Sequence, residues 1–210
     1  MEMMNSHPGI YLVLDPSMDE ELLLHKLSLC LKEKLAAVQI WDNFNAEQNI
    51  PDLVQKVCER CQPKGVRVFI NNRWNLLSNT DVDGVHFDEI PENYSVIKTK
   101  VNKPFLSGLT CNNDLAWVHW ANENQMDYIS FCSIFPSSTA NSCDLVDFET
   151  IQQASEIFSK AIFLAGGIKP ENIEKLSSLK YNGVAVVSGI MSSDTPDLAI
   201  KQYQEKLNSK

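Results

Sequence analysis

The sequence predicts an α/β protein, a single (β/α)8 TIM barrel that takes in residues 1–210. Short apolar runs rich in β-branched residues alternate eight times with amphipathic segments of helical period, and eight strand–helix units in one domain indicate this barrel. Several runs, such as Ile162–Ala165 and Val184–Val187, are almost continuously apolar, as in strands that a parallel sheet buries on both faces. A doubly wound open sheet is the alternative, but it usually has five or six strands and would leave two units unplaced.

The predicted strands follow one another with helices between them. In chain order the strands are Ile10–Asp15, Ala36–Trp41, Arg67–Asn72, Asp83–Phe87, Phe105–Leu109, Tyr128–Phe135, Ala161–Gly167 and Gly183–Gly189. The first helix follows Asp19 and Glu20, acidic residues suited to a helix N-terminus, and runs to Cys30. The further helices are Ile50–Gln62, Asn113–Glu123, Phe148–Ser159, Pro170–Leu179 and Thr195–Leu207, with shorter ones at Trp74–Asn79 and Glu92–Lys98. Pro170 and Pro196 suit a first helical turn.

Composition excludes several classes of function. Eighteen Lys plus Arg against 27 Asp plus Glu give a net charge of −9, which argues against nucleic-acid or anionic-membrane binding. No apolar run approaches the roughly 20 residues of a membrane span, and the first residues lack the pattern of a signal peptide. The six cysteines are scattered among apolar neighbours, which is typical of a reducing compartment. We therefore expect a cytoplasmic protein.

In a barrel the functional residues lie at the carboxyl ends of the strands. Gly166 and Gly167 end the seventh strand, and Ser188 with Gly189 ends the eighth, where barrels often bind phosphate through backbone N–H groups. The alternative is that the two glycines only make a tight turn. Ser137, Ser138 and Thr139 follow the sixth strand and either donate to phosphate oxygens or belong to an ordinary polar loop.

Other strand ends carry polar residues with less specific patterns. Asn71 and Asn72 are suited to reading a heterocycle, and Arg73 to pairing with a carboxylate under the rim. Asp88 and Glu89 are either metal ligands or a capping pair before Pro91. His86, in an apolar run, is more typical of a satisfied core residue than of a catalyst. The pair Cys58 and Cys61 lacks the second half of a zinc site.

Several sequence motifs stand in register along the chain. The strongest are Asp83-Gly84-Val85-His86, Asp127-Tyr128-Ile129 with Ile134-Phe135-Pro136-Ser137-Ser138-Thr139, Ala165-Gly166-Gly167-Ile168 with Asn172, and Gly183-Val184-Ala185-Val186-Val187-Ser188. In these motifs the chain resembles the thiamine phosphate synthase family, which also includes thiazole tautomerase-like members. The resemblance implies a transferase of thiamine biosynthesis that joins hydroxymethylpyrimidine diphosphate to thiazole phosphate, with Mg²⁺ and release of pyrophosphate. It also implies a thiazole-phosphate site made of Ser137, Thr139, Gly166, Gly167, Val187 and Ser188.

The diphosphate half of the site departs from the family pattern. Trp41 and Asn43 stand where the family has an arginine and a lysine, Asn72 where it has an aspartate, and Ala140 where it has a lysine. By resemblance, Gln39, Asn71 and Thr110 remain as the catalytic candidates on this side. Asp88 and Glu89 are the candidate ligands for Mg²⁺, which is required only if the synthase activity is retained.

Three hypotheses follow from this mixture. The first is an active synthase. The second is a diverged relative that binds a thiazole phosphate or thiamine phosphate without the coupling chemistry. The third is an isomerase of a phosphorylated heterocycle. Because Ser133 is a poor general base on its own, Cys132, Cys111 or His86 would transfer the proton. All three predict a small phosphorylated heterocycle as ligand, no nucleic acid or membrane as partner, and are compatible with a homo-oligomer.

Overall fold

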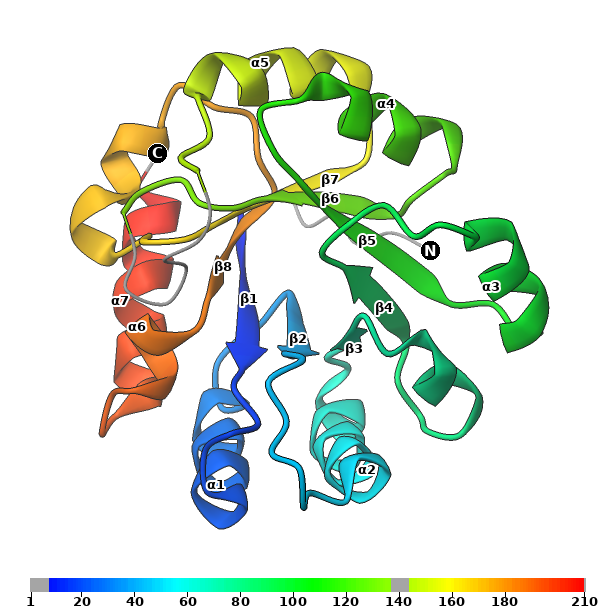
Figure 1. Cartoon of the computed structure of the whole chain (residues 1–210). Helices are drawn as coiled ribbons and strands as arrows, with labels where there is room; N and C mark the ends of the chain where they lie inside the picture. The colour runs from blue at the N-terminus through cyan, green and yellow to red at the C-terminus, as the bar shows by residue number, and fades with distance from the viewer. Residues whose placement is uncertain (1–7, 137–143, 210) are drawn as a thin grey trace.

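The computed structural model describes residues 8–136 and 144–209, and within them eight parallel strands close into a barrel. Each strand pairs with the next along the chain, and β8 pairs with β1 to complete the ring (Figure 1). The predicted (β/α)8 barrel is confirmed. The strands are β1 Gly9–Leu14, β2 Ala37–Ile40, β3 Val68–Asn71, β4 Gly84–Phe87, β5 Leu106–Cys111, β6 Tyr128–Phe131, β7 Ala161–Ala165 and β8 Gly183–Val186.

Helices surround the strands on all sides of the view (Figure 1). They are α1 Glu20–Cys30, α2 Ile50–Cys61, α3 Tyr94–Val101, α4 Leu115–Glu123, α5 Phe148–Ile157, α6 Ser188–Met191 and α7 Pro196–Asn208, with 3-10 helices η1 Gln62–Lys64, η2 Trp74–Ser78 and η3 Pro170–Leu176. None of the helices among the described residues has both the length and the apolar character that crossing a bilayer demands.

Several predicted boundaries are wrong, each for a local reason. The strands predicted as Tyr128–Phe135, Ala161–Gly167 and Gly183–Gly189 end four, two and three residues earlier than predicted. In β7 the cause is Gly166 and Gly167, whose φ angles of +86° and +64° leave the extended region. The predicted helix from Asn113 begins at Leu115 because the Asp114 carboxylate caps it, accepting from the Ala116 N–H at 2.9 Å.

Three further helices differ from the prediction. The segment predicted as Glu92–Lys98 is α3, which begins two residues later at Tyr94. The segments predicted as Pro170–Leu179 and Trp74–Asn79 are the 3-10 helices η3 and η2. Such tight helices are characteristic of short connecting pieces. Helix α6, a four-residue helix directly after β8, was not predicted as a separate element.

Two apolar layers hold the barrel together. The larger one fills the space between the strands and the surrounding helices. The smaller one lies inside the barrel and is dominated by four aromatic rings, those of Tyr11, Phe69, Tyr128 and Phe163. Their centroids lie 5.1–5.9 Å apart, at the tilted and edge-on angles that aromatic rings prefer. These rings form the floor beneath the functional end of the barrel.

At the opposite end of the barrel, three hydrogen bonds from backbone to side chain join neighbouring strands, and we call them clips. Each of the residues Asp83, Asp127 and Asn182 directly precedes an even-numbered strand and accepts a hydrogen bond from the backbone at the start of the strand before it. The donors are the N–H groups of Val68, Ser107 and Ile162, at 2.8, 2.8 and 2.9 Å. These N–H groups would otherwise lack a partner at the sheet end, so the clips satisfy them and fix the register.

Candidate active site

A cavity of about 790 Å³ opens at the carboxyl ends of the strands. Its volume is typical of a small-molecule site. Nine of the residues predicted from the sequence line it: Gln39, Asn71, Asp88, Glu89, Thr110, Gly166, Gly167, Val187 and Ser188. The predicted residues Ser137 and Thr139, and Ala140 beside them, lie outside the described residues. The structure therefore brings together every predicted site residue that it describes.

The glycine pair after β7 forms a tight turn that has no room for a side chain. A Cβ on Gly166 would overlap Ser133 Oγ, and a Cβ on Gly167 would come within 2.6 Å of the Phe135 carbonyl oxygen. Asn172 holds the turn from η3, because its Nδ2 donates to the Gly167 carbonyl at 2.9 Å and its Oδ1 accepts from the Lys169 N–H at 2.8 Å. This backbone can approach an anion closely.

The start of α6 and a lysine complete this corner of the cavity. Val187 directly follows β8, and the four-residue helix α6 begins at Ser188. Backbone N–H groups at the start of a helix are suited to phosphate oxygens. Lys169, exposed on the loop after the glycines, is the one Lys or Arg among the described residues that line the cavity. We call Gly166, Gly167, Lys169 and Ser188 the phosphate corner.

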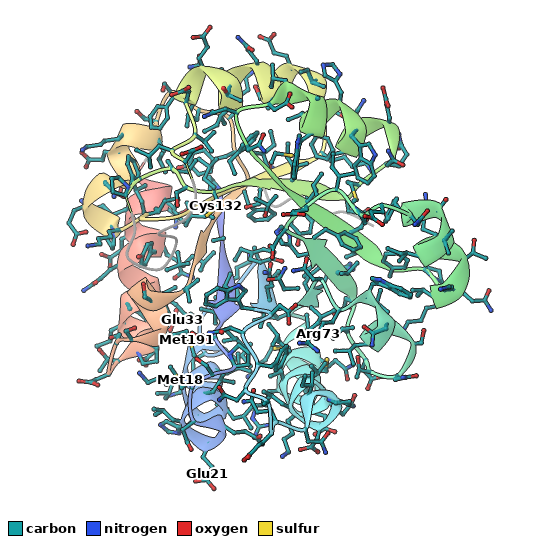
Figure 2. The ribbon with its side chains drawn as sticks, viewed as in Figure 1. Met18, Glu21, Glu33, Arg73, Cys132 and Met191 are labelled. Atoms are coloured by element: carbon teal, nitrogen blue, oxygen red, sulfur yellow. The ribbon has the colours of Figure 1, made fainter. Side chains whose placement is uncertain are left out.

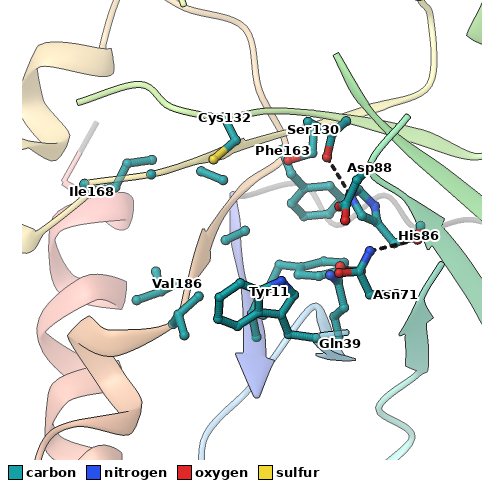
Figure 3. Close-up of a pocket in the computed structure, with 18 of the residues that line it drawn as sticks. Tyr11, Gln39, Asn71, His86, Asp88, Ser130, Cys132, Phe163, Ile168 and Val186 are labelled. Carbon is teal, nitrogen blue, oxygen red and sulfur yellow. Dashed lines mark hydrogen bonds between the residues drawn. The ribbon is translucent and has the colours of Figure 1, made fainter. Parts of the chain in front are cut away.

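Across the cavity, five side chains form a continuous hydrogen-bonded chain. The Tyr11 hydroxyl donates to Gln39 Oε1 at 2.9 Å and lies 2.7 Å from the Tyr128 hydroxyl. The Tyr128 hydroxyl lies 2.9 Å from His86 Nδ1, and His86 Nε2 lies 2.8 Å from Thr110 Oγ1. We call this set the polar chain. Figure 3 shows Tyr11, Gln39 and His86 directed into the same space.

Strand alternation places these residues, since every second residue of a strand points to the same face. Gln39 in β2, His86 in β4 and Thr110 in β5 all take inward positions. Gly108, also inward on β5, leaves the space that the Tyr128 ring occupies, because a Cβ at this position would overlap the ring. The polar chain therefore depends on a glycine in the neighbouring strand.

Burial keeps the polar chain neutral. Desolvation lowers the pKa of His86 from 6.5 to about 4, and the nearby Asp88 charge opposes this only in part. Desolvation likewise raises the pKa values of Tyr11 and Tyr128 above the ordinary value of 10.0. At neutral pH the imidazole is therefore uncharged, with one nitrogen donating and the other accepting.

The loops after β3 and β4 form an amide and carboxylate rim. Asn71, fully buried, donates from Nδ2 to the His86 carbonyl at 3.2 Å. Asn72 and Asp88 exchange two hydrogen bonds, with Asn72 Nδ2 on Asp88 Oδ2 at 2.8 Å and the Asp88 N–H on Asn72 Oδ1 at 3.0 Å. Asp88 and Glu89 are exposed and face the cavity side by side.

Positions where the resemblance leads one to expect cations hold neutral or paired groups. Trp41 lines the cavity and is half-buried. Asn43 donates to Asp15 Oδ1 at 2.9 Å. Arg73, labelled in Figure 2, does pair with a carboxylate as predicted: its Nε lies 2.6 Å from Asp42 Oδ1. Its guanidinium also lies 5.0 Å from the centroid of the Phe44 ring.

Tyr11, Tyr128 and Lys169 line the cavity but are not predicted by the residues at the ends of the strands. The two tyrosines point inward from positions earlier in β1 and β6, and the alternation along these strands is the signal that identifies them. His86 proves to be a satisfied buried residue that also lines the cavity. Cys58 and Cys61 are fully buried in α2, where desolvation raises the pKa of both thiols to about 12.

Comparisons with known proteins identify the family and show the same fold in a solved structure. The family described as "Thiamine monophosphate synthase" matches residues 10–190. "Thiamine-phosphate synthase 1" of Aquifex aeolicus is 32% identical over 206 residues, covering 94% of each chain. "Thiamine-phosphate synthase" of Methanobrevibacter smithii is 25% identical over 208 residues, covering 99% of each. Thiamine phosphate pyrophosphorylase from Pyrococcus furiosus has the same fold, with a TM-score of 0.81 at 17% identity over 96% of each chain. The chain belongs to the thiamine monophosphate synthase family.

Proposed function

We propose that the protein is a thiamine-phosphate synthase of thiamine biosynthesis, which joins hydroxymethylpyrimidine diphosphate to thiazole phosphate and releases pyrophosphate. One observation carries the proposal: in a chain of this family, a single cavity combines a phosphate corner with an opposite wall of amides and hydroxyls. The first suits the thiazole phosphate, and the second suits a heterocycle with its own diphosphate.

The phosphate corner binds the thiazole phosphate. The Gly166–Gly167 backbone and the start of α6 at Ser188 supply neutral donors, and Lys169 supplies the charge. Val187 shapes the wall beside them. Ser137 and Thr139 remain predicted contributors, on the resemblance alone.

The opposite wall binds the pyrimidine. Gln39 has an amide that carries a donor and an acceptor, which is what a ring nitrogen next to an amino group needs. Asn71 is fixed by its hydrogen bond to the His86 carbonyl, and Thr110 offers a hydroxyl at the end of the polar chain opposite Gln39. These three residues orient the carbon that reacts.

Asp88 and Glu89 fit a Mg²⁺ ion held together with a diphosphate. Among the described residues no cluster of three or more His, Cys, Asp or Glu surrounds a metal position. Mg²⁺, however, is commonly bound by one or two carboxylates, the remaining ligands being substrate phosphates and water. Asn72 holds the Asp88 carboxylate toward the cavity. When bound there, Mg²⁺ neutralises charge on the leaving diphosphate.

In the reaction the bond from the pyrimidine methylene carbon to the diphosphate oxygen breaks, and that oxygen keeps the electron pair. The thiazole nitrogen supplies the pair for the new carbon–nitrogen bond. Because Trp41 and Asn43 contribute no charge, the leaving group has few cations among the described residues. Each missing charge-stabilising donor typically lowers the rate by about 10²–10³. We therefore expect turnover below the median for enzymes, near 0.1 s⁻¹ rather than about 10 s⁻¹.

The test is a coupled assay with the purified protein, both precursors and Mg²⁺, in which thiamine phosphate is oxidised and followed by its fluorescence. Formation of product at the expected rate supports the proposal, and a Lys169→Gln variant should then show a raised KM for thiazole phosphate. Absence of turnover would contradict it. If thiamine phosphate still raised the melting temperature, the protein would be the binding relative, since a ligand stabilises the state that binds it.

Two further features stay predictions. A cytoplasmic location rests on cysteine usage; Cys30, Cys58, Cys61 and Cys111 are free thiols. A homo-oligomer is the other prediction, and sedimentation of the purified protein measures its oligomeric state. Of the residues that could move the proton in an isomerase, Cys132 and His86 line the cavity, whereas Cys111 is buried outside it and burial raises its thiol pKa to about 12.

A further inference from the structure

The polar chain has two ends on the cavity and no spare proton to donate between them. Tyr11 and Tyr128 each have one proton and contact two partners, and His86 has one partner on each ring nitrogen. Its two terminal residues, Gln39 and Thr110, both line the cavity. Each bond in the series therefore limits the direction of the next.

The donor in each hydrogen bond of the polar chain follows from the bond between Tyr11 and Gln39. Tyr11 uses its proton on Gln39 Oε1, so Tyr128 must donate to the Tyr11 oxygen. The Tyr128 oxygen must then accept from His86 Nδ1–H, which leaves Nε2 as the acceptor of the Thr110 proton. In this state the Gln39 amide NH₂ is a donor toward the cavity, while the Thr110 oxygen is only an acceptor.

Turning the Gln39 amide over reverses every bond. Gln39 Nε2 then donates to Tyr11, Tyr11 to Tyr128 and Tyr128 to His86 Nδ1. His86 Nε2–H donates to Thr110, whose own proton becomes available to a ligand. Both states hold the same number of protons and the same charge, since three hydroxyls and an amide rotate and the imidazole proton moves from Nδ1 to Nε2.

We propose that the polar chain is a reversible relay that couples the donor or acceptor character of Gln39 to the opposite character of Thr110, with the tautomer of His86 as its middle position. An aminopyrimidine whose amino group donates to Gln39 Oε1 selects the second state and is met by a hydroxyl donor at Thr110. This choice of ligand rests on the proposed function; the coupling itself does not. Tyr11, Tyr128 and His86 are then positioning residues that set the specificity for the heterocycle.

The first test needs no substrate. ¹⁵N NMR of the histidine rings distinguishes the two neutral tautomers of His86, and we expect the Nδ1–H form in the free wild-type protein. Tyr11→Phe removes the link to Gln39 and frees Tyr128 to donate to Nδ1, so the Nε2–H form should rise to a substantial fraction. The matched control is Tyr94→Phe, which removes another buried tyrosine hydroxyl, bonded to Ser107 at 2.7 Å outside the cavity. It should leave the tautomer unchanged.

The second test adds 4-amino-2-methylpyrimidine as the probe, and we expect it to shift His86 toward Nε2–H in the wild type but not in Tyr128→Phe. A tautomer ratio that is the same in the wild type and Tyr11→Phe would overturn the relay, whatever the synthase assay gives. In an active enzyme, Tyr11→Phe should raise the KM for the pyrimidine substrate up to about tenfold, the loss of one hydrogen bond, with little change for thiazole phosphate. A fall in kcat with both KM values unchanged would contradict this assignment.

Discussion

Lys169 is the residue on which the charge of the cavity depends. Its ammonium is exposed, so its attraction for a phosphate is partly screened by water and amounts to roughly 1 kcal/mol. Lys169→Gln should therefore weaken the binding of thiazole phosphate about fivefold, as measured by calorimetric titration. Lys180→Gln makes the same charge change before β8, at the other end of the barrel, and should leave the affinity within twofold. If both variants changed the affinity equally, Lys169 would not contact the phosphate.

His86 makes the stability of the fold depend on pH. Its pKa is about 4 in the folded protein and 6.5 as the ordinary value, so between these pH values the unfolded chain binds more protons. The stabilisation is complete above pH 6.5 and is lost as the pH falls toward 4, by up to about 3 kcal/mol. Urea unfolding across this range should therefore show a steeper loss for the wild type than for His86→Gln.

Among the glycines, Gly167 and Gly65 form a natural pair for comparison. Their φ angles are +64° and +66°, but a Cβ on Gly65 meets no atom within 4 Å, whereas one on Gly167 meets the Phe135 carbonyl oxygen at 2.6 Å. Gly65→Ala should cost about 1 kcal/mol of unfolding free energy from backbone strain alone. Gly167→Ala should cost more and should also raise the KM for thiazole phosphate at least tenfold. Unequal stability losses with an unchanged KM would place the phosphate elsewhere.

At the scale of the elements, the clips at the N-terminal ends of the strands are a measurable source of stability. Asp83→Ala leaves the buried Val68 N–H without its acceptor, which should lower the unfolding free energy by about 1–3 kcal/mol in urea titrations. Asp81→Ala removes an exposed carboxylate two residues earlier, bonded only to Gln55 among the contacts described. It should change the unfolding free energy by no more than about 0.5 kcal/mol.

The sequence predicts the elements well where their cause is local. Apolar runs are visible in the sequence, so all eight strands were found, and Asp19 and Pro196 mark helix starts because their effect is confined to one turn. The ends of β6 and β8 were misjudged because apolar residues continue past them: Ile134, for example, is buried under a loop and not in a strand. Burial is a property of the whole fold, and hydrophobicity alone does not reveal which backbone conformation achieves it.

At the scale of the whole molecule, barrel topology made the site predictable. Residues as far apart as Gln39 and Ser188 meet because the carboxyl ends of all strands share one end of the barrel. The polar chain was not predictable in the same way. It requires Gly108 to make room for Tyr128, and it requires a register that places His86 opposite Gly108 in the pairing of β4 with β5. These are relations among strands that no single segment contains.

The carboxylate rim has a consequence for how substrates arrive. Asp88 and Glu89 stand at the mouth of the cavity in a chain of net charge −9, so phosphorylated precursors approach against a repulsive field. Added salt shortens the reach of that field, to about 6 Å at 0.3 M. Stopped-flow mixing with thiazole phosphate should therefore show an association rate constant that increases between low salt and about 0.3 M, the reverse of electrostatic attraction. If the rate constant decreased with salt, the attraction of Lys169 would outweigh the repulsion of Asp88 and Glu89. If it increases, ionic strength controls how fast substrates diffuse through this acidic entrance.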